Sequence, residues 1–99
     1  MKTFKIINNK NAVSSQFQEI EVNRFELNKN LAQPLYMQLA IQLQTLIESH
    51  EFDQAKPLPS IDKCYRMLGI SKSTVFQAYT YLNKNGLVHW KKGQGFYAK

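Results

Sequence analysis

Two short helical segments separated by three residues constrain the fold of this chain more than any other feature of its sequence. Ser60 is suited to capping a helix over residues 61–68, and Gly69 is suited to ending it. Ser71 is suited to capping a second helix, which is expected over residues 72–85. Two helices joined by a tight turn that contains glycine predict a helix-turn-helix.

An amphipathic pattern precedes this pair of helices. Pro34 suits the first position of a helix, because its missing N–H has no partner there anyway. The apolar residues that follow it at helical spacing are Leu35, Leu39, Leu43, Leu46 and Ile47. They predict a helix of about 16 residues that ends near His50. Further upstream, apolar residues over 19–27 favour a weak or bulged strand.

The pattern changes again after Gly86, which is expected to stop the second helix of the pair. Residues 87–90 and 95–98 are strand-like, and residues 91–94 between them suit a hairpin turn. The expected fold is mainly α-helical with a small β-hairpin, a winged helix-turn-helix over residues 32–99. Residues 1–31 are expected to form an N-terminal arm or an extra strand, and they are a candidate dimerisation element.

Charge is distributed unevenly along the chain. Asp62 is the last acidic residue, so residues 63–99 carry seven bases and no acid (+7), whereas residues 1–62 carry six bases and seven acids (6 − 7 = −1), which sums to +6. An acid-free stretch of this kind attracts polyanions, and both nucleic acid and an anionic membrane surface qualify. On charge alone, a basic surface that only aids solubility is an equal alternative.

Several classes of protein are excluded by composition. A single cysteine, Cys64, rules out an internal disulfide and a Cys-rich zinc site, and we expect it to be a small core residue. No metal or other cofactor is expected. The apolar runs are too short to span a membrane, and the N-terminus becomes polar too early for a signal peptide, so a cytoplasmic location is expected. Without a nucleophile–base set or a phosphate loop, no enzyme is predicted.

The second helix of the pair has two distinct faces. At 100° per residue, Val75, Ala78, Tyr79 and Leu82 share the face that is expected to pack inward. The opposite face carries Ser73, Gln77, Thr80 and Lys84. An α-helix fits the major groove of DNA, and the N–H groups at its N-terminus favour phosphate. A solvated face without a partner is the alternative interpretation.

Lys91 and Lys92 lie at the tip of the predicted hairpin, from which they can reach a minor groove or a row of phosphates. Ordinary solubilising lysines are the alternative. Two aromatic residues have ambiguous positions nearby. Phe76 is expected to pack under the hairpin rather than touch a thymine methyl group, and Trp90 is expected in the core or in a dimer contact.

Six short motifs follow one another along the chain. They are Pro34-Leu35-Tyr36, Leu58-Pro59-Ser60, Leu68-Gly69-Ile70-Ser71-Lys72-Ser73-Thr74-Val75, Ala78-Tyr79-Thr80-Tyr81-Leu82, Gly86-Leu87-Val88 and Gly93-Gln94-Gly95-Phe96-Tyr97. In type, order and spacing they resemble the DNA-binding domain of the GntR family of bacterial transcription regulators. The resemblance implies a winged helix-turn-helix that binds operator DNA, typically as a homodimer on a pseudo-palindrome.

The chain departs from the family pattern at a few positions. Asp62 stands where the family usually has an arginine that contacts the DNA backbone, and Lys72 stands where it has another arginine. Gln54 and Ala55 replace a Pro-Gly pair in the loop before the first of the two helices. Family members carry a C-terminal effector or dimerisation domain, so this chain is expected to be either a shortened regulator or a minimal family member.

The sequence therefore predicts a sequence-specific regulator that binds double-stranded DNA, with helix 72–85 in the major groove and the wing, residues 88–97, on the minor groove or flanking phosphates. The candidate DNA-binding residues are Ser60, Lys63, Ser71, Lys72, Ser73, Thr74, Gln77, Lys91, Lys92, Gly93 and Gln94. One alternative is a protein-interaction module that has lost operator binding, which Asp62 supports. Another is an RNA or single-strand binder. No pocket for a small-molecule effector can be identified.

Overall fold

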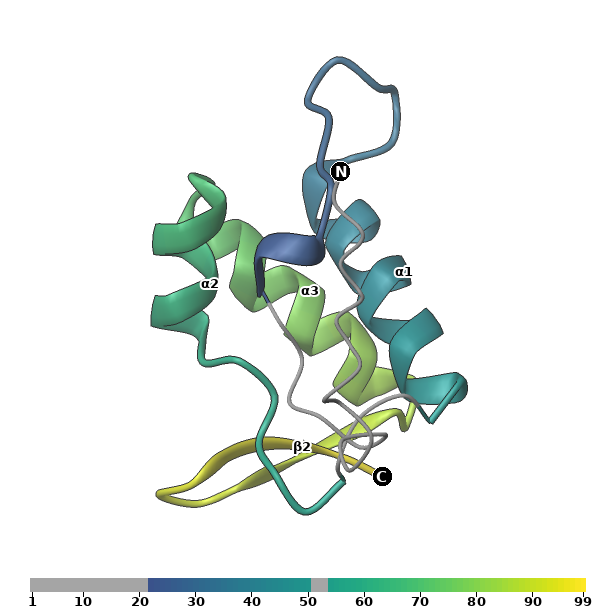
Figure 1. Ribbon diagram of the computed structural model, residues 1–99, viewed down its shortest axis with the longest axis vertical. Coiled ribbons are helices and arrows are strands. Elements are labelled where there is room, and N and C mark those ends of the chain that lie inside the picture. The colour runs from purple at the N-terminus through teal and green to yellow at the C-terminus, as the bar shows by residue number, and fades with distance from the viewer. Residues whose placement is uncertain (1–21, 51–53) are drawn as a thin grey trace, which may run out of the picture.

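The computed structural model describes residues 22–50 and 54–99. Its elements are, in order, η3 (Val22–Arg24), α1 (Leu35–Glu48), α2 (Ile61–Leu68), α3 (Lys72–Lys84), β1 (Val88–Lys91) and β2 (Gly95–Ala98). Figure 1 shows the three α-helices packed together above the β1–β2 hairpin, which runs beneath α3 with its tip on the same side of the molecule as α2. The predicted winged helix-turn-helix is confirmed.

The two predicted serine caps form as expected. The Oγ atom of Ser60 accepts a hydrogen bond from the N–H of Lys63 at 3.0 Å, and that of Ser71 accepts one from the N–H of Thr74 at 3.0 Å. Gly69 ends α2 in the left-handed region at φ 68°, where a side chain would clash with the following carbonyl. Local sequence therefore determines where both helices of the pair begin and where the first one ends.

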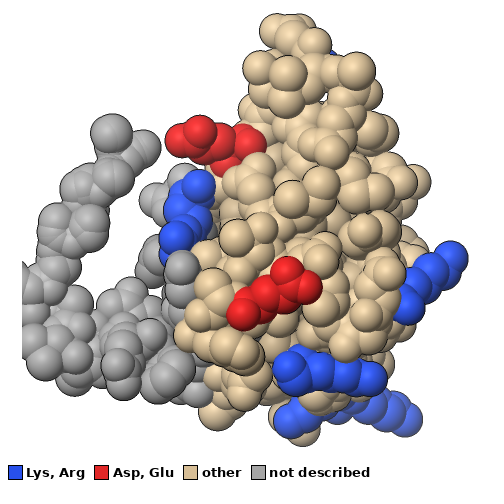
Figure 2. Space-filling view, turned by 90° about the vertical axis from the view of Figure 1, so that its right-hand side faces the viewer, with Lys and Arg blue, Asp and Glu red and all other residues tan. Residues whose placement is uncertain are grey.

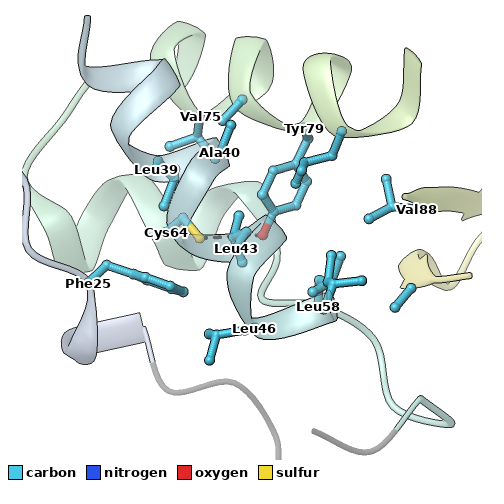
Figure 3. Packing of buried hydrophobic residues seen from close by; sticks show 14 of the residues in the cluster. Phe25, Leu39, Ala40, Leu43, Leu46, Leu58, Cys64, Val75, Tyr79 and Val88 are labelled. Atoms are coloured by element: carbon cyan, nitrogen blue, oxygen red, sulfur yellow. Dashed lines mark hydrogen bonds between the residues drawn. The ribbon is translucent and has the colours of Figure 1, made fainter. Parts of the chain in front are cut away.

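The core lies between α1 and α3 and is closed by α2. Figure 3 shows Leu39 and Leu43 of α1 facing Val75 and Tyr79 of α3, with Cys64 of α2 beside them. All five side chains are completely buried. The inward face predicted for α3 is confirmed, and Cys64 is the small core residue that was expected. Burial on this scale is the main source of stability for so small a domain.

The strand predicted over residues 19–27 is wrong for the part that the structure describes. Val22–Arg24 form a 3-10 helix, and the N–H of Phe25 donates to the carbonyl of Val22 at 3.2 Å. Val22 and Phe25 both enter the core at 2% and 6% exposure. Their spacing of three, which suggested a change of face in a strand, is one turn of a 3-10 helix. Residues 19–21 lie outside the described residues.

Side-chain amides of α1 hold the segment after η3. Gln38 accepts from the N–H of Asn28 at 2.8 Å and donates to the carbonyls of Asn28 and Gln33 at 3.0 and 2.7 Å. Gln42 makes the same exchange with the backbone of Glu26, at 3.0 and 2.8 Å. These bonds satisfy backbone groups that a strand would have paired with a neighbouring strand, so the segment is fixed without a sheet.

The hairpin is antiparallel, with Val88 opposite Ala98 and Lys91 opposite Gly95. Gly93 in the turn and Gly95 after it have φ values of 75° and 116°, which other residues rarely adopt. The base of the hairpin is buried, and the N–H of Leu58 donates to the carbonyl of Phe96 at 2.8 Å. The hairpin is thereby joined to the chain that enters α2.

The expected burial of two aromatic residues is wrong. Phe76 is 58% exposed and Trp90 is 57% exposed. The space under the hairpin is filled by Tyr79, whose ring meets that of Phe96 edge to face at 5.0 Å. Trp90 follows Val88 on the same face of β1, but it lies nearer the tip, where its ring meets that of Phe96 edge to face at 5.0 Å. A dimer contact for Trp90 stays a prediction.

Candidate nucleic-acid interface

The outer face of α3 is polar and accessible. Ser73, Gln77 and Lys84 are exposed, and Thr80 is half-buried between them. Because Val75, Ala78, Tyr79 and Leu82 fix the opposite face in the core, the helix cannot rotate to hide these groups. The face offers hydroxyl and amide groups, which can donate to and accept from base edges, next to a cationic amine.

The first turn of α3 is defined by the cap at Ser71. Besides accepting from the N–H of Thr74, the hydroxyl of Ser71 lies 2.7 Å from that of Thr74. Lys72 and Ser73 are exposed in this turn, whereas Thr74 is half-buried. A helix N-terminus carries a partial positive charge, so this turn suits a phosphate. Two of the predicted DNA-binding hydroxyls, those of Ser71 and Thr74, are already engaged with each other.

Lys72 contacts α2 as well as solvent. Its Nζ atom lies 3.5 Å from the carboxylate of Asp62 and 5.8 Å from the centroid of the Tyr65 ring. Asp62 also lies 3.8 Å from the guanidinium of Arg66, one turn further along α2. The sequence contains the i, i+4 spacing of Asp62 and Arg66, but it gave no sign of the contact with Lys72, which depends on how α2 and α3 pack.

The residues that begin α2 lie at the surface. Ser60 is exposed, although its hydroxyl serves as the helix cap, and Lys63 is exposed in the first turn. Of the candidate residues of the helix pair, the structure therefore places six at the surface and leaves Thr74 half-buried; the six are Ser60, Lys63, Ser71, Lys72, Ser73 and Gln77.

The wing presents the remaining candidates. Lys91 is the last residue of β1, and its amine lies 4.3 Å from the centroid of the Tyr97 ring, a favourable cation–π distance. Lys92, Gly93 and Gln94 form the exposed turn, which the N–H of Gln94 closes on the carbonyl of Lys91 at 2.8 Å. The hairpin is attached to α3 through the Phe96–Tyr79 contact, so the two cationic elements belong to one packed unit.

The α1 side of the molecule has a different character. Figure 2 shows this side, with Lys and Arg side chains mainly at its edges, including the lower edge where Figure 1 places the hairpin. Its middle is mostly uncharged and carries acidic side chains. The outer face of α1 therefore offers little positive charge to a polyanion.

A buried polar contact lies directly behind the exposed face of α3. The hydroxyl of Tyr79 donates to the carbonyl of Pro59 and lies 3.5 Å from the sulfur of Cys64. Burial raises the pKa of the Cys64 thiol, an effect that the hydrogen bond to Tyr79 and the charge of Lys63 oppose. Burial also raises the pKa of Tyr79 well above its ordinary value, and Cys64 adds to that rise. Both groups are neutral at physiological pH, and such a thiol is chemically inert.

Other kinds of site find no support in the described part of the chain. Over residues 22–50 and 54–99, no group of three or more His, Cys, Asp or Glu side chains could hold a metal ion. No helix in these same ranges is long and apolar enough to cross a membrane.

Three helices and a hairpin, with a polar helix face next to a cationic turn, define a winged helix-turn-helix of the kind that binds nucleic acid. The model of the family described as "Bacterial regulatory proteins, gntR family" matches residues 35–98, and the chain belongs to this family. It contains the DNA-binding domain of a transcription regulator. The resemblance inferred from the six motifs is confirmed.

Relatives and solved structures agree with this assignment. The chain is 39% identical over 69 residues to the HTH-type transcriptional repressor NagR of Bacillus subtilis (strain 168); the match covers 70% of this chain and 28% of NagR. The chain thus spans less than a third of the length of this curated relative. YtrA from Sulfolobus acidocaldarius, a GntR-family transcription factor, is similar with a TM-score of 0.70 and 32% identity, over 76% of this chain and 79% of YtrA.

A solved complex has the same fold. The DNA-binding domain of AraR in complex with its operator ORR3 superimposes with a TM-score of 0.63 and 20% identity, over 75% of this chain and 89% of AraR's. At this identity the likeness concerns the fold alone.

Proposed function

We propose that this domain binds double-stranded DNA sequence-specifically, with α3 in the major groove and the β1–β2 wing on the minor groove or flanking phosphates. The observation that carries the proposal is the exposed polar face of α3, which is packed as one unit with a lysine-bearing hairpin in the acid-free part of the chain. That NagR is named a repressor, and that the AraR domain was solved on its operator, supports the same mode of action.

The proposed contacts divide into two kinds. Ser60, Lys63, Ser71, Lys72 and Thr74, which surround the start of α2 and α3, would bind phosphates and set the register of the protein on the duplex. The side chains of Ser73 and Gln77 would reach base edges; an amide such as that of Gln77 can pair with adenine through two hydrogen bonds. In the wing, Lys91, Lys92, Gly93 and Gln94 would contact the neighbouring groove or its phosphates.

A salt series on duplex DNA tests the proposal. The logarithm of the binding constant should fall linearly with the logarithm of the salt concentration, by about 0.9 for each phosphate contact. Binding to duplex but not to single-stranded DNA or RNA of the same length is the expected result. No duplex binding at low salt would favour a protein-interaction module, and a preference for single strands or RNA would contradict the proposal in another way.

Gln77→Ala separates base recognition from phosphate binding. On sites selected from a random pool, we expect the variant to lose roughly 1–3 kcal/mol of discrimination against altered sites, while its affinity for random DNA changes little. Gln44→Ala on α1 is the matched control, because it removes the same amide from a helix to which no DNA contact is assigned, and it should change neither quantity. Equal losses for Gln77→Ala on selected and random DNA would show that Gln77 does not read bases.

We also propose that the regulator acts in the cytoplasm as a homodimer on a pseudo-palindromic site, with residues 1–31 contributing to association. The support is the family membership, since two-fold related half-sites match a two-fold symmetric protein. Sedimentation of the whole chain and of a chain lacking residues 1–21, which keeps the core residues Val22 and Phe25, tests this. Identical monomer–dimer behaviour would remove residues 1–21 from the proposal.

A further inference from the structure

One carboxylate lies among the cations at the start of the helix pair. The Oδ1 atom of Asp62 is 3.5 Å from the amine of Lys72, and its Oδ2 atom is 3.8 Å from the guanidinium of Arg66. The side chains of Lys72 and Asp62 are 66% and 55% exposed, so the pair lies at the surface. Asp62 also precedes the whole acid-free stretch of the chain. The amine that begins α3 is therefore held toward α2 in the unbound protein.

A phosphate and Asp62 would compete for the same amine. An ion pair between exposed side chains contributes little to stability, so Lys72 can exchange one anion for another. The exchange is not neutral, however, because Asp62 then loses one of its two cationic partners and keeps only Arg66, while it remains near the phosphates. Either the carboxylate takes up a cation from solution or it repels the DNA, and both effects weaken binding.

We propose that Asp62 is a positioning residue for Lys72 that lowers the affinity of this domain for duplex DNA. Its carboxylate holds the amine of Lys72 against α2, and Lys72 must exchange this carboxylate for a phosphate each time the domain binds DNA. Asp62 thereby limits sequence-independent binding, which depends on phosphate contacts, more than it limits base recognition. This inference rests on the proposed function, because it concerns the strength of the same interface.

Asp62→Asn tests the inference with the whole chain. The substitution removes the charge and keeps the shape of the side chain. We expect it to tighten binding to a random-sequence duplex about three- to tenfold at physiological salt. The slope of log K against log salt should become steeper by up to about 0.9 per domain, because no cation is taken up at position 62 when the complex forms. Thermal unfolding of the variant checks that the fold is kept.

Glu48→Gln is the matched control. It makes the same change of charge and size on an exposed residue at the end of α1. At physiological salt a charge acts over only about 8 Å, so we expect the control to change affinity by less than about twofold. Equal effects of the two substitutions would overturn the proposal, because only net charge would then matter.

A double-mutant cycle shows whether Asp62 acts through Lys72. In a Lys72→Met background, Asp62→Asn should give less than half of the logarithmic gain that it gives in the wild type. An undiminished gain overturns the positioning role, and weaker binding by Asp62→Asn alone would indicate that the carboxylate itself contacts DNA.

If the wild type and every variant fail to bind duplex, the proposed function is at fault. If the wild type binds and Asp62→Asn does not differ from Glu48→Gln, the present inference fails alone.

Discussion

The inner and outer sides of α3 differ in their exposure to solvent. On the inner side Val75, Ala78, Tyr79 and Leu82 are completely inaccessible to solvent, whereas on the outer side Ser73 and Gln77 are exposed. The inner side determines how the helix is oriented, and the outer side determines which polar groups the helix offers to a binding partner. The difference teaches that substitutions on the inner side should act through stability and those on the outer side through recognition.

The largest effect is expected for Leu82→Ala on the inner side. Removing a fully buried leucine side chain loses its transfer free energy and leaves a cavity, so the free energy of unfolding should fall by about 2–5 kcal/mol. Urea denaturation followed by circular dichroism measures this. DNA affinity per folded molecule should be unchanged. A loss below about 1 kcal/mol would mean that the core around α3 is less well packed than described.

Tyr79→Phe should have the next largest effect. It keeps the ring that contacts Phe96 but leaves the buried carbonyl of Pro59 without its partner, which typically costs about 1–3 kcal/mol. Tyr81→Phe is the matched control, since Tyr81 is only half-buried on the same helix, and its stability should change by less than about 0.5 kcal/mol. If both variants lost equal stability, the hydroxyl of Tyr79 would have no special role.

Phe76→Ala should have the smallest effect on stability and sharpens the comparison most. Because Phe76 is 58% exposed, the free energy of unfolding should change by less than about 0.5 kcal/mol. Its place on α3 between Lys72 and Gln77 leads us to expect weaker binding to sites that contain thymine, whose methyl group accepts apolar contacts. Met67→Ala, a change at a 55% exposed residue of α2, is the control. If Phe76→Ala lowered stability without weakening binding, Phe76 would act through packing, as the residues on the inner side of α3 do.

Features that depend on neighbouring residues in the sequence were predictable. The caps at Ser60 and Ser71 and the turn at Gly69 are determined by local geometry, and the four-residue inner face of α3 follows from its period. These features were sufficient for the fold class and for the polar face of α3. The family motifs contain the same residues, so the family resemblance and the local helix signals predict the same fold.

Features that depend on tertiary packing were not predictable. The pattern around Val22 and Phe25 favours a strand, because nothing in the sequence shows that Gln38 and Gln42 satisfy the backbone after them. Phe76 is expected under the hairpin because it flanks the inner face of α3, but the ring of Tyr79 fills that space and Phe76 stays exposed. The contact between Asp62 and Lys72 joins two helices across the turn, and its existence depends on their crossing angle.

The two residues before Ser60 have a consequence for the kind of duplex that this domain can accept. The backbone of Leu58 is bonded to β2 through Phe96, and the backbone of Pro59 is bonded to α3 through Tyr79. Helix α3 and the wing are therefore both hydrogen-bonded to the same short piece of chain, which fixes the distance between them. A duplex whose groove spacing differs from that distance must deform to fit, so the stiffness of the DNA itself should contribute to the choice of site.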